Sequence, residues 1–177
     1  MKKIAFLLVF SLFLLGCDNK NKTKTSGEVS LNSELILVGE TYSVPGFSFE
    51  SASVELYNPA GGNTIPDLFA LPEVQNNVYS AYFDTQNNYP SFALVGEFDS
   101  SSEALDFYNN YKQVNVNNYT GLAKPVLKNQ IWVFKTRNDK FAKLLILKVE
   151  AYLKDTEAFA EVTFKWVYQP NGSTVLP

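Results

Sequence analysis

The chain has 177 residues, of which 46% are hydrophobic, 19% charged and 15% aromatic, and its formal net charge is −3. It contains no histidine and a single cysteine, which excludes catalytic triads with an imidazole base, histidine-ligated metal sites, internal disulfides and zinc ribbons. The negative charge argues against nucleic-acid binding, and the length indicates one domain large enough to bury a core.

The N-terminus has the features of a bacterial lipoprotein signal. Two lysines precede an apolar run over residues 4–15, which is shorter than the roughly 20 residues of a membrane-spanning helix. The run ends in Leu14-Leu15-Gly16-Cys17, the pattern of a lipobox. We therefore predict that residues 1–16 are removed as a signal peptide and that lipid on Cys17 anchors the protein to the cell envelope. The outer membrane and the periplasmic face of the inner membrane are both open, and an uncleaved apolar anchor is the alternative reading.

Polar residues follow the cysteine, and Asp18–Gly27 contains no large apolar side chain. Such a stretch cannot bury apolar surface and favours a flexible tether. We expect residues 17–33 to be the lipidated cysteine and this tether, and residues 34–177 to form a single β domain.

Alternation of apolar and polar residues dominates the rest of the chain and predicts β-strands. In the last predicted strand, Val162, Phe164, Trp166 and Tyr168 share one face. The strands are expected at residues 35–38, 42–44, 47–50, 53–57, 78–83, 91–98, 131–136, 141–152 and 162–168. Polar connections at 84–90 and 137–140 suggest two hairpins, and Asp155, Glu157 and Glu161 are expected in a solvated loop.

One helix interrupts this pattern. Ser100 and Glu103 have the spacing of a capping box, and apolar residues follow at helical intervals, which predicts a helix near 101–111. Helix capping accounts for the acidic group Glu97, Asp99, Glu103 and Asp106 better than a calcium or magnesium site does. The predicted fold class is therefore all-β, an antiparallel sandwich or barrel with one short helix.

Aromatic residues exceed what alternating core positions require, and the excess falls in predicted loops and at their edges. Tyrosines there can stack on a flat ligand or a sugar, and a tyrosinate can ligate ferric haem. The candidate ligand-binding residues are Tyr79, Tyr82, Tyr89, Tyr108, Tyr111 and Tyr119. Arg137, the only arginine, is expected to be solvated at a hairpin tip. No acidic pair lies in a motif for glycoside hydrolysis, which would need two convergent carboxylates.

Two C-terminal segments resemble a known family. Residues 133–143 match the pattern V-x-K-T-x-x-x-K-[FY]-A-K, and residues 162–172 match V-T-F-x-[YW]-V-Y-Q-x-[DN]-G. Both patterns are similar to the C-terminal hairpin region of HmuY-like lipoproteins. The resemblance implies an all-β, hand-like fold on a lipid anchor. In characterised members, two histidines or methionines grip haem from both faces, but the chain after residue 16 contains neither residue type.

We therefore expect a non-enzymatic, lipid-anchored envelope protein that captures a ligand or interacts with a partner. The expected contacts are the membrane, a small hydrophobic or planar ligand and an envelope protein, but no nucleic acid. One alternative is haem binding through tyrosine ligation or stacking, and haem is then the cofactor; otherwise no cofactor and no metal is expected. The other alternative is a structural or assembly lipoprotein that holds a protein partner.

Overall fold

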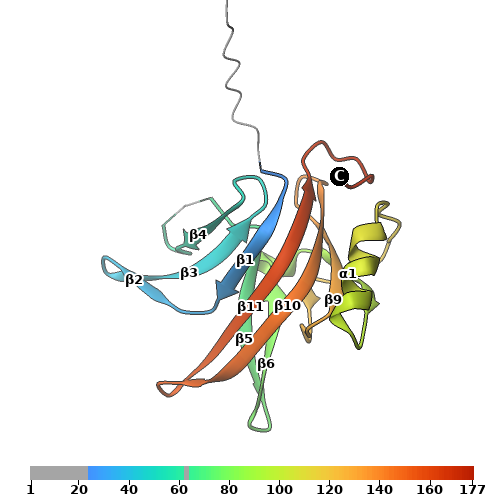
Figure 1. The fold of residues 1–177 in the computed structure, drawn as a ribbon. Helices are drawn as coiled ribbons and strands as arrows, with labels where there is room; N and C mark the ends of the chain where they lie inside the picture. Colours follow the sequence, from blue (N-terminus) through green and yellow to red (C-terminus); the bar gives the residue numbers. More distant parts are fainter. Residues whose placement is uncertain (1–23, 62–63) are drawn as a thin grey trace, which may run out of the picture.

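The computed structural model describes residues 24–61 and 64–177, so Cys17 and the predicted signal peptide lie outside the described residues. The described chain is a sandwich of two antiparallel sheets with one short helix, which confirms the predicted fold class (Figure 1). The elements are β1 (Ser26–Asn32), β2 (Ile36–Val38), β3 (Thr41–Ser48), β4 (Ser53–Tyr57), β5 (Leu68–Gln75), β6 (Val78–Asp84), η1 (Gln86–Asn88), β7 (Phe92–Glu97), α1 (Ser101–Asn110), β8 (Leu122–Ala123), β9 (Gln130–Lys135), β10 (Phe141–Lys154) and β11 (Glu157–Gln169).

The first sheet has the strand order β1-β11-β10-β9-β7, and the second has the order β2-β3-β5-β6-β8 with β4 also paired to β3. The main core lies between the two sheets. The predicted inner face of β11 is confirmed, because its alternate large side chains are all buried there. The ring of Phe164 packs edge-on against the second-sheet aromatics Phe47 and Phe83. The buried β11 residues are Val162, Phe164, Trp166 and Tyr168.

Helix α1 covers the outer face of the first sheet. The predicted capping box is confirmed, since the Ser100 hydroxyl accepts a hydrogen bond from the Glu103 backbone N–H at 3.3 Å. Lys143, only 1% exposed, reaches up from β10 and donates to the carbonyls of Tyr108 and Tyr111 at the C-terminal end of the helix. Burial is the main reason that the pKa of Lys143 falls to about 8. A buried ammonium therefore ties the helix to the sheet.

Several expectations about the strands were wrong. The segment at residues 84–90 does not close a hairpin: β6 lies in the second sheet and β7 in the first, so the chain crosses the sandwich there. A connection of this length between two sheets has the same polar composition as a hairpin loop, so the sequence pattern does not distinguish the two. The strands expected at 42–44 and 47–50 are one strand, β3, which ends at Ser48, because Pro45 and Gly46 continue the pairing with β4.

Three further strands were missed: β1, β5 and the two-residue β8, which pairs with β6. Ser26–Asn32, expected in the tether, forms β1 and pairs along its length with β11. Leu68–Gln75 forms β5, which pairs with β6 across a tight turn in which Asn76 and Asn77 both have positive φ. The expected loop at 155–161 is instead a two-residue turn at Asp155 and Thr156, and Glu157 and Glu161 lie within β11.

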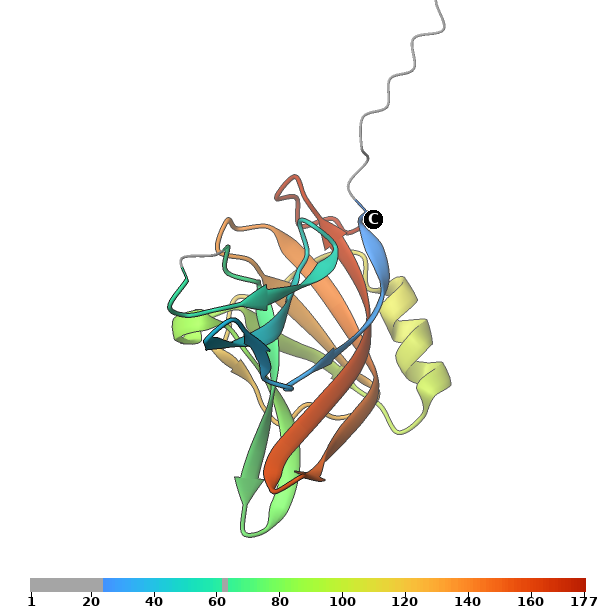
Figure 2. The ribbon, with the colours of Figure 1, turned by 90° about the vertical axis from the view of Figure 1, so that its left-hand side faces the viewer.

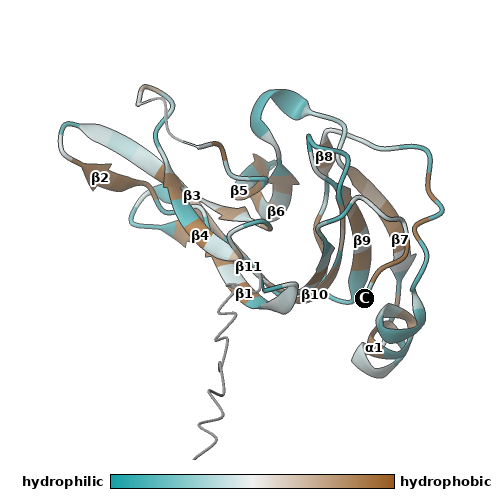
Figure 3. Cartoon of the chain, turned by 90° about the horizontal axis from the view of Figure 1, so that it is seen from above, coloured by the Kyte–Doolittle hydropathy of each residue, from teal (hydrophilic) through white to brown (hydrophobic). Residues whose placement is uncertain are grey.

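The two ends of the sandwich differ. β1 begins at Ser26, beside Val167, and runs to Asn32, beside Glu161. The turn of the β10–β11 hairpin therefore lies at the opposite end from Ser26. Figure 2 shows the β5–β6 and β10–β11 hairpins projecting together from that end. The β2–β3 hairpin projects sideways from the body, and its β2 strand is hydrophobic (Figure 3).

Candidate functional site

A cavity of about 400 Å³ lies between the β2–β3 hairpin and the tip of the β10–β11 hairpin. We call it the hairpin cavity. Three segments form it: the link between β1 and β2, one residue of β3, and the tip where β10 turns into β11. The lining residues are Ser33, Glu34, Leu35, Tyr42, Lys154, Asp155, Glu157, Ala158 and Phe159.

The apolar part of this cavity follows from strand register. Tyr42 of β3 lies directly opposite Leu37 of β2, so both side chains are on the same face of the hairpin. Leu35, two residues before Leu37, is on that face too, and both Leu35 and Tyr42 line the cavity. On the opposing hairpin, the rings of Phe159 and Tyr152 lie 5.2 Å apart. Aromatic and aliphatic surface therefore meets the cavity from both hairpins.

The charged part of the cavity is acidic. The ammonium of Lys154 lies 3.1 Å from a carboxylate oxygen of Glu34 and 5.0 Å from the centre of the Phe159 ring. Glu34, Asp155 and Glu157 are three carboxylates against this single ammonium, so the lining carries a net charge of −2. The cavity thus combines apolar walls with a rim that favours a positively charged group.

The six tyrosines predicted to bind a ligand do not come together. Tyr79 and Tyr82 lie on β6, Tyr89 follows η1, Tyr108 and Tyr111 lie at the end of α1, and Tyr119 lies in the loop before β8. None of them is among the residues that line the hairpin cavity or the second cavity described below. Ligand binding by these six tyrosines stays a prediction.

Burial of these side chains bears on haem ligation. Tyr108 is only 1% exposed, and burial raises its pKa, as it does for Tyr82, Tyr111 and Tyr119. A raised pKa favours the neutral phenol over the tyrosinate that would ligate ferric iron. Within the described chain, the hydroxyls of Tyr108 and Tyr119 are buried without a hydrogen-bond partner. Tyr108 belongs to a buried apolar cluster, and Tyr111 and Tyr119 pack against another.

The sequence missed the two tyrosines that do reach cavities, Tyr42 and Tyr168. Both occupy regular strand positions, where an aromatic residue is usually assigned to packing. Tyr42 was recognisable in principle, because it follows the apolar run 35–38 and a Gly39-Glu40 turn that places it opposite that run.

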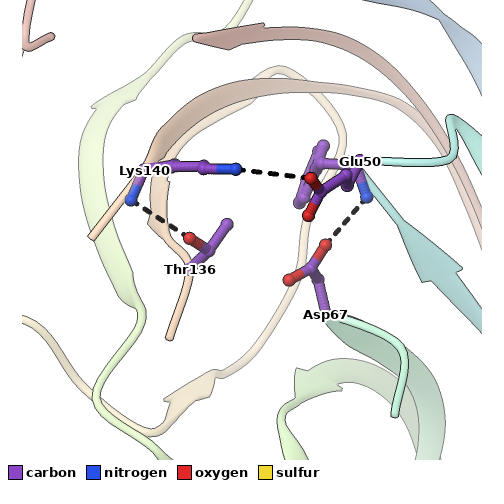
Figure 4. Close-up of polar contacts among 5 residues, drawn as sticks. Glu50, Asp67, Thr136 and Lys140 are labelled. Atoms are coloured by element: carbon purple, nitrogen blue, oxygen red, sulfur yellow. Dashed lines mark hydrogen bonds and ion pairs between the residues drawn. The ribbon is translucent and has the colours of Figure 1, made fainter. Parts of the chain in front are cut away.

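A second, polar cavity of about 210 Å³ lies at the other end of the sandwich, lined by residues of β3, β11, the β9–β10 turn and the segment before β5. Its lining includes Asp67, Glu50, Arg137 and Tyr168. Figure 4 shows Lys140 reaching across it to Glu50, with 3.5 Å between the ammonium and the carboxylate oxygen. Figure 4 also shows the Asp67 carboxylate accepting a hydrogen bond of 2.8 Å from the backbone N–H of Phe49.

Burial dominates the electrostatics of the polar cavity. It raises the pKa of Asp67 to about 6, although the Phe49 N–H and the Arg137 guanidinium both act to lower it. Burial, together with the charges of Asp67 and Glu50, raises the pKa of Tyr168 to about 12. Arg137, expected to be solvated at a hairpin tip, is exposed at the β9–β10 turn, and its guanidinium also donates to the carbonyl of Gln86 at 2.6 Å. Its contact with the loop after β6 depends on tertiary structure and has no local sequence signal.

Across residues 24–61 and 64–177, no group of three or more acidic or cysteine side chains is arranged to hold a metal ion. No helix in that part of the chain is both long enough and apolar enough to cross a bilayer. Comparison with known proteins found no matching family model, no matching curated protein and no matching solved structure.

Proposed function

We propose that this chain is a lipid-anchored bacterial cell-envelope protein that captures a ligand or a protein partner in the hairpin cavity and does not catalyse a reaction. The lipobox at Cys17 and the polar residues after it support the anchor. The tip of the β10–β11 hairpin lies at the opposite end of the domain from Ser26, so an anchored domain would hold it away from the membrane.

Exposed apolar surface around the hairpin cavity is the observation that carries this proposal. The four consecutive residues Leu35–Val38 are all exposed, and Tyr42 is 61% exposed beside them. Further exposed apolar residues lie at the two other hairpin tips. An isolated exposed leucine needs no explanation, but a contiguous apolar patch around a cavity marks a binding surface. The additional exposed residues at the tips are Val74, Val78, Tyr152 and Leu153.

The HmuY-like resemblance supports the same reading. The two matching segments form the β9–β10 hairpin and the second half of β11, and they supply much of the sandwich core, including Trp166 and Phe134. They are therefore positions that a shared fold would keep for packing. We therefore use the resemblance to propose the architecture and the envelope location. We derive the proposed binding site from the hairpins of this chain.

Haem binding is the second candidate function, and Tyr42 favours it, because its exposed phenol lines a cavity that also contains Phe159. The acidic rim opposes it, since haem carries two propionates that would meet Asp155 and Glu157. Titration of the full chain with haemin separates the two readings. A Soret shift that is lost in Tyr42→Phe would establish haem ligation, and an unchanged Soret band at micromolar protein would end this candidate.

Native mass spectrometry of the full chain, purified in mild detergent from the membrane of the host that makes it, tests the proposal. Capture at the hairpin cavity predicts a bound species that disappears in Leu37→Lys. Leu127→Lys is the matched control, because Leu127 is also exposed (46%) but lies in the segment before β9. A bound small molecule would establish ligand capture, and a bound polypeptide would establish the interaction or assembly role. Spectra that are identical for the wild type and Leu37→Lys would contradict the proposal.

A further inference from the structure

We propose that the occupant of the hairpin cavity is an extended segment of a partner protein, which adds a strand to the open edge of β2 and places a lysine or arginine side chain in the cavity. This inference rests on the proposed capture function and specifies the chemistry of what is captured. It draws on three features: the edge of β2, the apolar run that forms it, and the charge of the adjacent cavity.

The backbone of β2 is available for pairing. Within the described chain, β2 pairs with β3 and with no other strand. Val38 pairs with Thr41 across the two-residue turn at Gly39 and Glu40, and the pair that flanks such a turn is hydrogen-bonded. Hydrogen bonding alternates along an antiparallel pair, so the N–H and C=O of Leu37 point away from β3. Leu37 can therefore accept and donate hydrogen bonds to an added strand.

The side chains along this edge are apolar, and natural proteins normally avoid apolar side chains on an open edge strand. Edge strands are usually protected by charged residues, proline, a bulge or a covering segment. In this chain, Leu35–Val38 is an uninterrupted apolar run, and all four side chains are exposed. An open apolar edge is the template on which an extended peptide adds by main-chain pairing.

The cavity beside the edge determines which side chain fits. Tyr42 lines the cavity, and Leu37 lies directly opposite it on the same face of the hairpin, so alternate side chains of an added strand would lie on that face and be directed toward the cavity. Aromatic rings of Tyr42 and Phe159 can stack on a cationic side chain, and its aliphatic stem can cover Leu35. The carboxylates of Asp155 and Glu157 then face the positive charge. Lysine and arginine each combine a cationic group that can stack on the rings, an aliphatic stem and a positive charge.

A second copy of the chain fits this edge poorly. An antiparallel β2–β2 pair centred on Leu37 would bring Glu34 of one copy, just before β2, toward Glu40 in the turn of the other, at both ends of the pair. Like charges brought together in this way repel each other. The same carboxylates would be repelled by an anionic membrane surface. Charge complementarity therefore favours a basic and apolar segment of a different protein.

The test uses the full chain in mild detergent and three fluorescein-labelled decapeptides of alternating valine and arginine, with binding followed by fluorescence anisotropy. The first peptide is unmodified, the second is N-methylated at every arginine and the third at every valine. In an added strand, all residues with side chains on one face direct their N–H groups to the same side. One of the two methylated peptides must therefore bind at least tenfold more weakly than the unmodified peptide. In antiparallel addition it is the peptide methylated at arginine, and in parallel addition it is the peptide methylated at valine. Equal binding of all three peptides would overturn the proposal.

Charge is tested on the protein side. The double variant Asp155→Asn/Glu157→Gln should bind the unmodified peptide at least tenfold more weakly. Asn at residue 155 suits the positive φ of that turn, so the hairpin should be kept. Asp106→Asn, which removes an exposed carboxylate on α1, is the matched control and should leave binding unchanged. An equal loss in the double variant and the control would show nonspecific attraction and overturn the proposal.

Two outcomes separate this inference from the capture function on which it rests. If the peptide fails to bind while native mass spectrometry shows a small molecule that depends on Leu37, capture stands and the peptide partner is wrong. If sedimentation shows a dimer of the full chain that Leu37→Lys dissociates, the occupant is a second copy and the inference is again overturned.

Discussion

Leu37 and Tyr42 lie directly opposite each other across β2 and β3, and they are 58% and 61% exposed. A cross-strand pair of an aliphatic and an aromatic residue normally stabilises a sheet by packing against the core. Here Tyr42 lines a cavity that has the β10–β11 tip on its other side, and Leu37 lies beside it on the same face of the hairpin. The sandwich core is complete without it, since the aromatic cluster around Phe47 and Trp166 closes the space between the sheets.

The exposed pair also separates stability from function in this fold. Because Leu37 and Tyr42 contribute little buried area, their replacement should cost little folding free energy and should act mainly on binding. The same holds for the charged residues at the β10–β11 tip.

The turn at the β10–β11 tip is predicted to be strained. Thr156 has φ of +76°, a conformation that disfavours a β-branched residue. We expect Thr156→Gly to raise the free energy of unfolding by about 0.5–1 kcal/mol, measured by urea denaturation. Thr156→Val keeps the branched Cβ and should give no gain. A loss of stability in Thr156→Gly would show that the turn is not strained.

The buried carboxylate of Asp67 should make stability depend on pH. Its pKa in the folded state, about 6, lies above the usual 3.8, so its stabilising contribution is present below about pH 4 and is lost as the pH rises through 6. Asp67→Asn keeps an acceptor for the Phe49 N–H and removes the charge. We expect the variant to gain about 2 kcal/mol relative to wild type between pH 4 and pH 7. A flat difference for Asp67→Asn would contradict the assignment.

Lys143 is predicted to be the main polar anchor of helix α1. Lys143→Met would leave the carbonyls of Tyr108 and Tyr111 without their buried donor, which should cost about 2–3 kcal/mol. Lys165→Met is the comparison, because Lys165 lies 5.9 Å from the Tyr108 ring centre and is less buried. Its cost in urea denaturation should stay below about 1 kcal/mol. Equal costs for both variants would mean that Lys143 acts only through general packing.

Lipid attachment at Cys17 predicts where the protein is found. Cys17→Ser removes the thiol that would carry the lipid, so the protein should move from the membrane fraction to a soluble fraction. Cell fractionation with immunoblotting measures this change. Retention of Cys17→Ser in the membrane would support an uncleaved apolar anchor instead.

Much of this fold was predictable because it follows from patterns among residues that are close together in the sequence. The alternation along β11 and the capping box of Ser100 and Glu103 each depend on a few neighbouring residues, and the structure has both. The failures had a different cause. Assigning the segment 84–90 required knowing which sheet each flanking strand joins, and β1 became a strand only because β11 offers it a partner.

The site was less predictable than the fold. The sequence predicts ligand-binding tyrosines in loops, whereas Tyr108 is buried on the side of α1 that faces the sheet and the cavity tyrosine, Tyr42, lies in a strand. The run Leu35–Val38 was predicted as a strand, but its exposure arises because no second layer covers β2 among the residues that the structure describes. Exposure of an apolar strand cannot be inferred from its own residues, because the same residues would suit a buried one.

Backbone amide exchange at Leu37 tests the central claim most directly. With the ¹⁵N-labelled full chain in mild detergent, the amide of Leu37 should exchange freely in the absence of a partner, because it points away from β3. A saturating amount of the valine–arginine peptide should slow its exchange at least tenfold and leave the amides of α1 unchanged. If peptide binding leaves the exchange of the Leu37 amide as fast as before, β2 is not the edge at which this protein captures its partner.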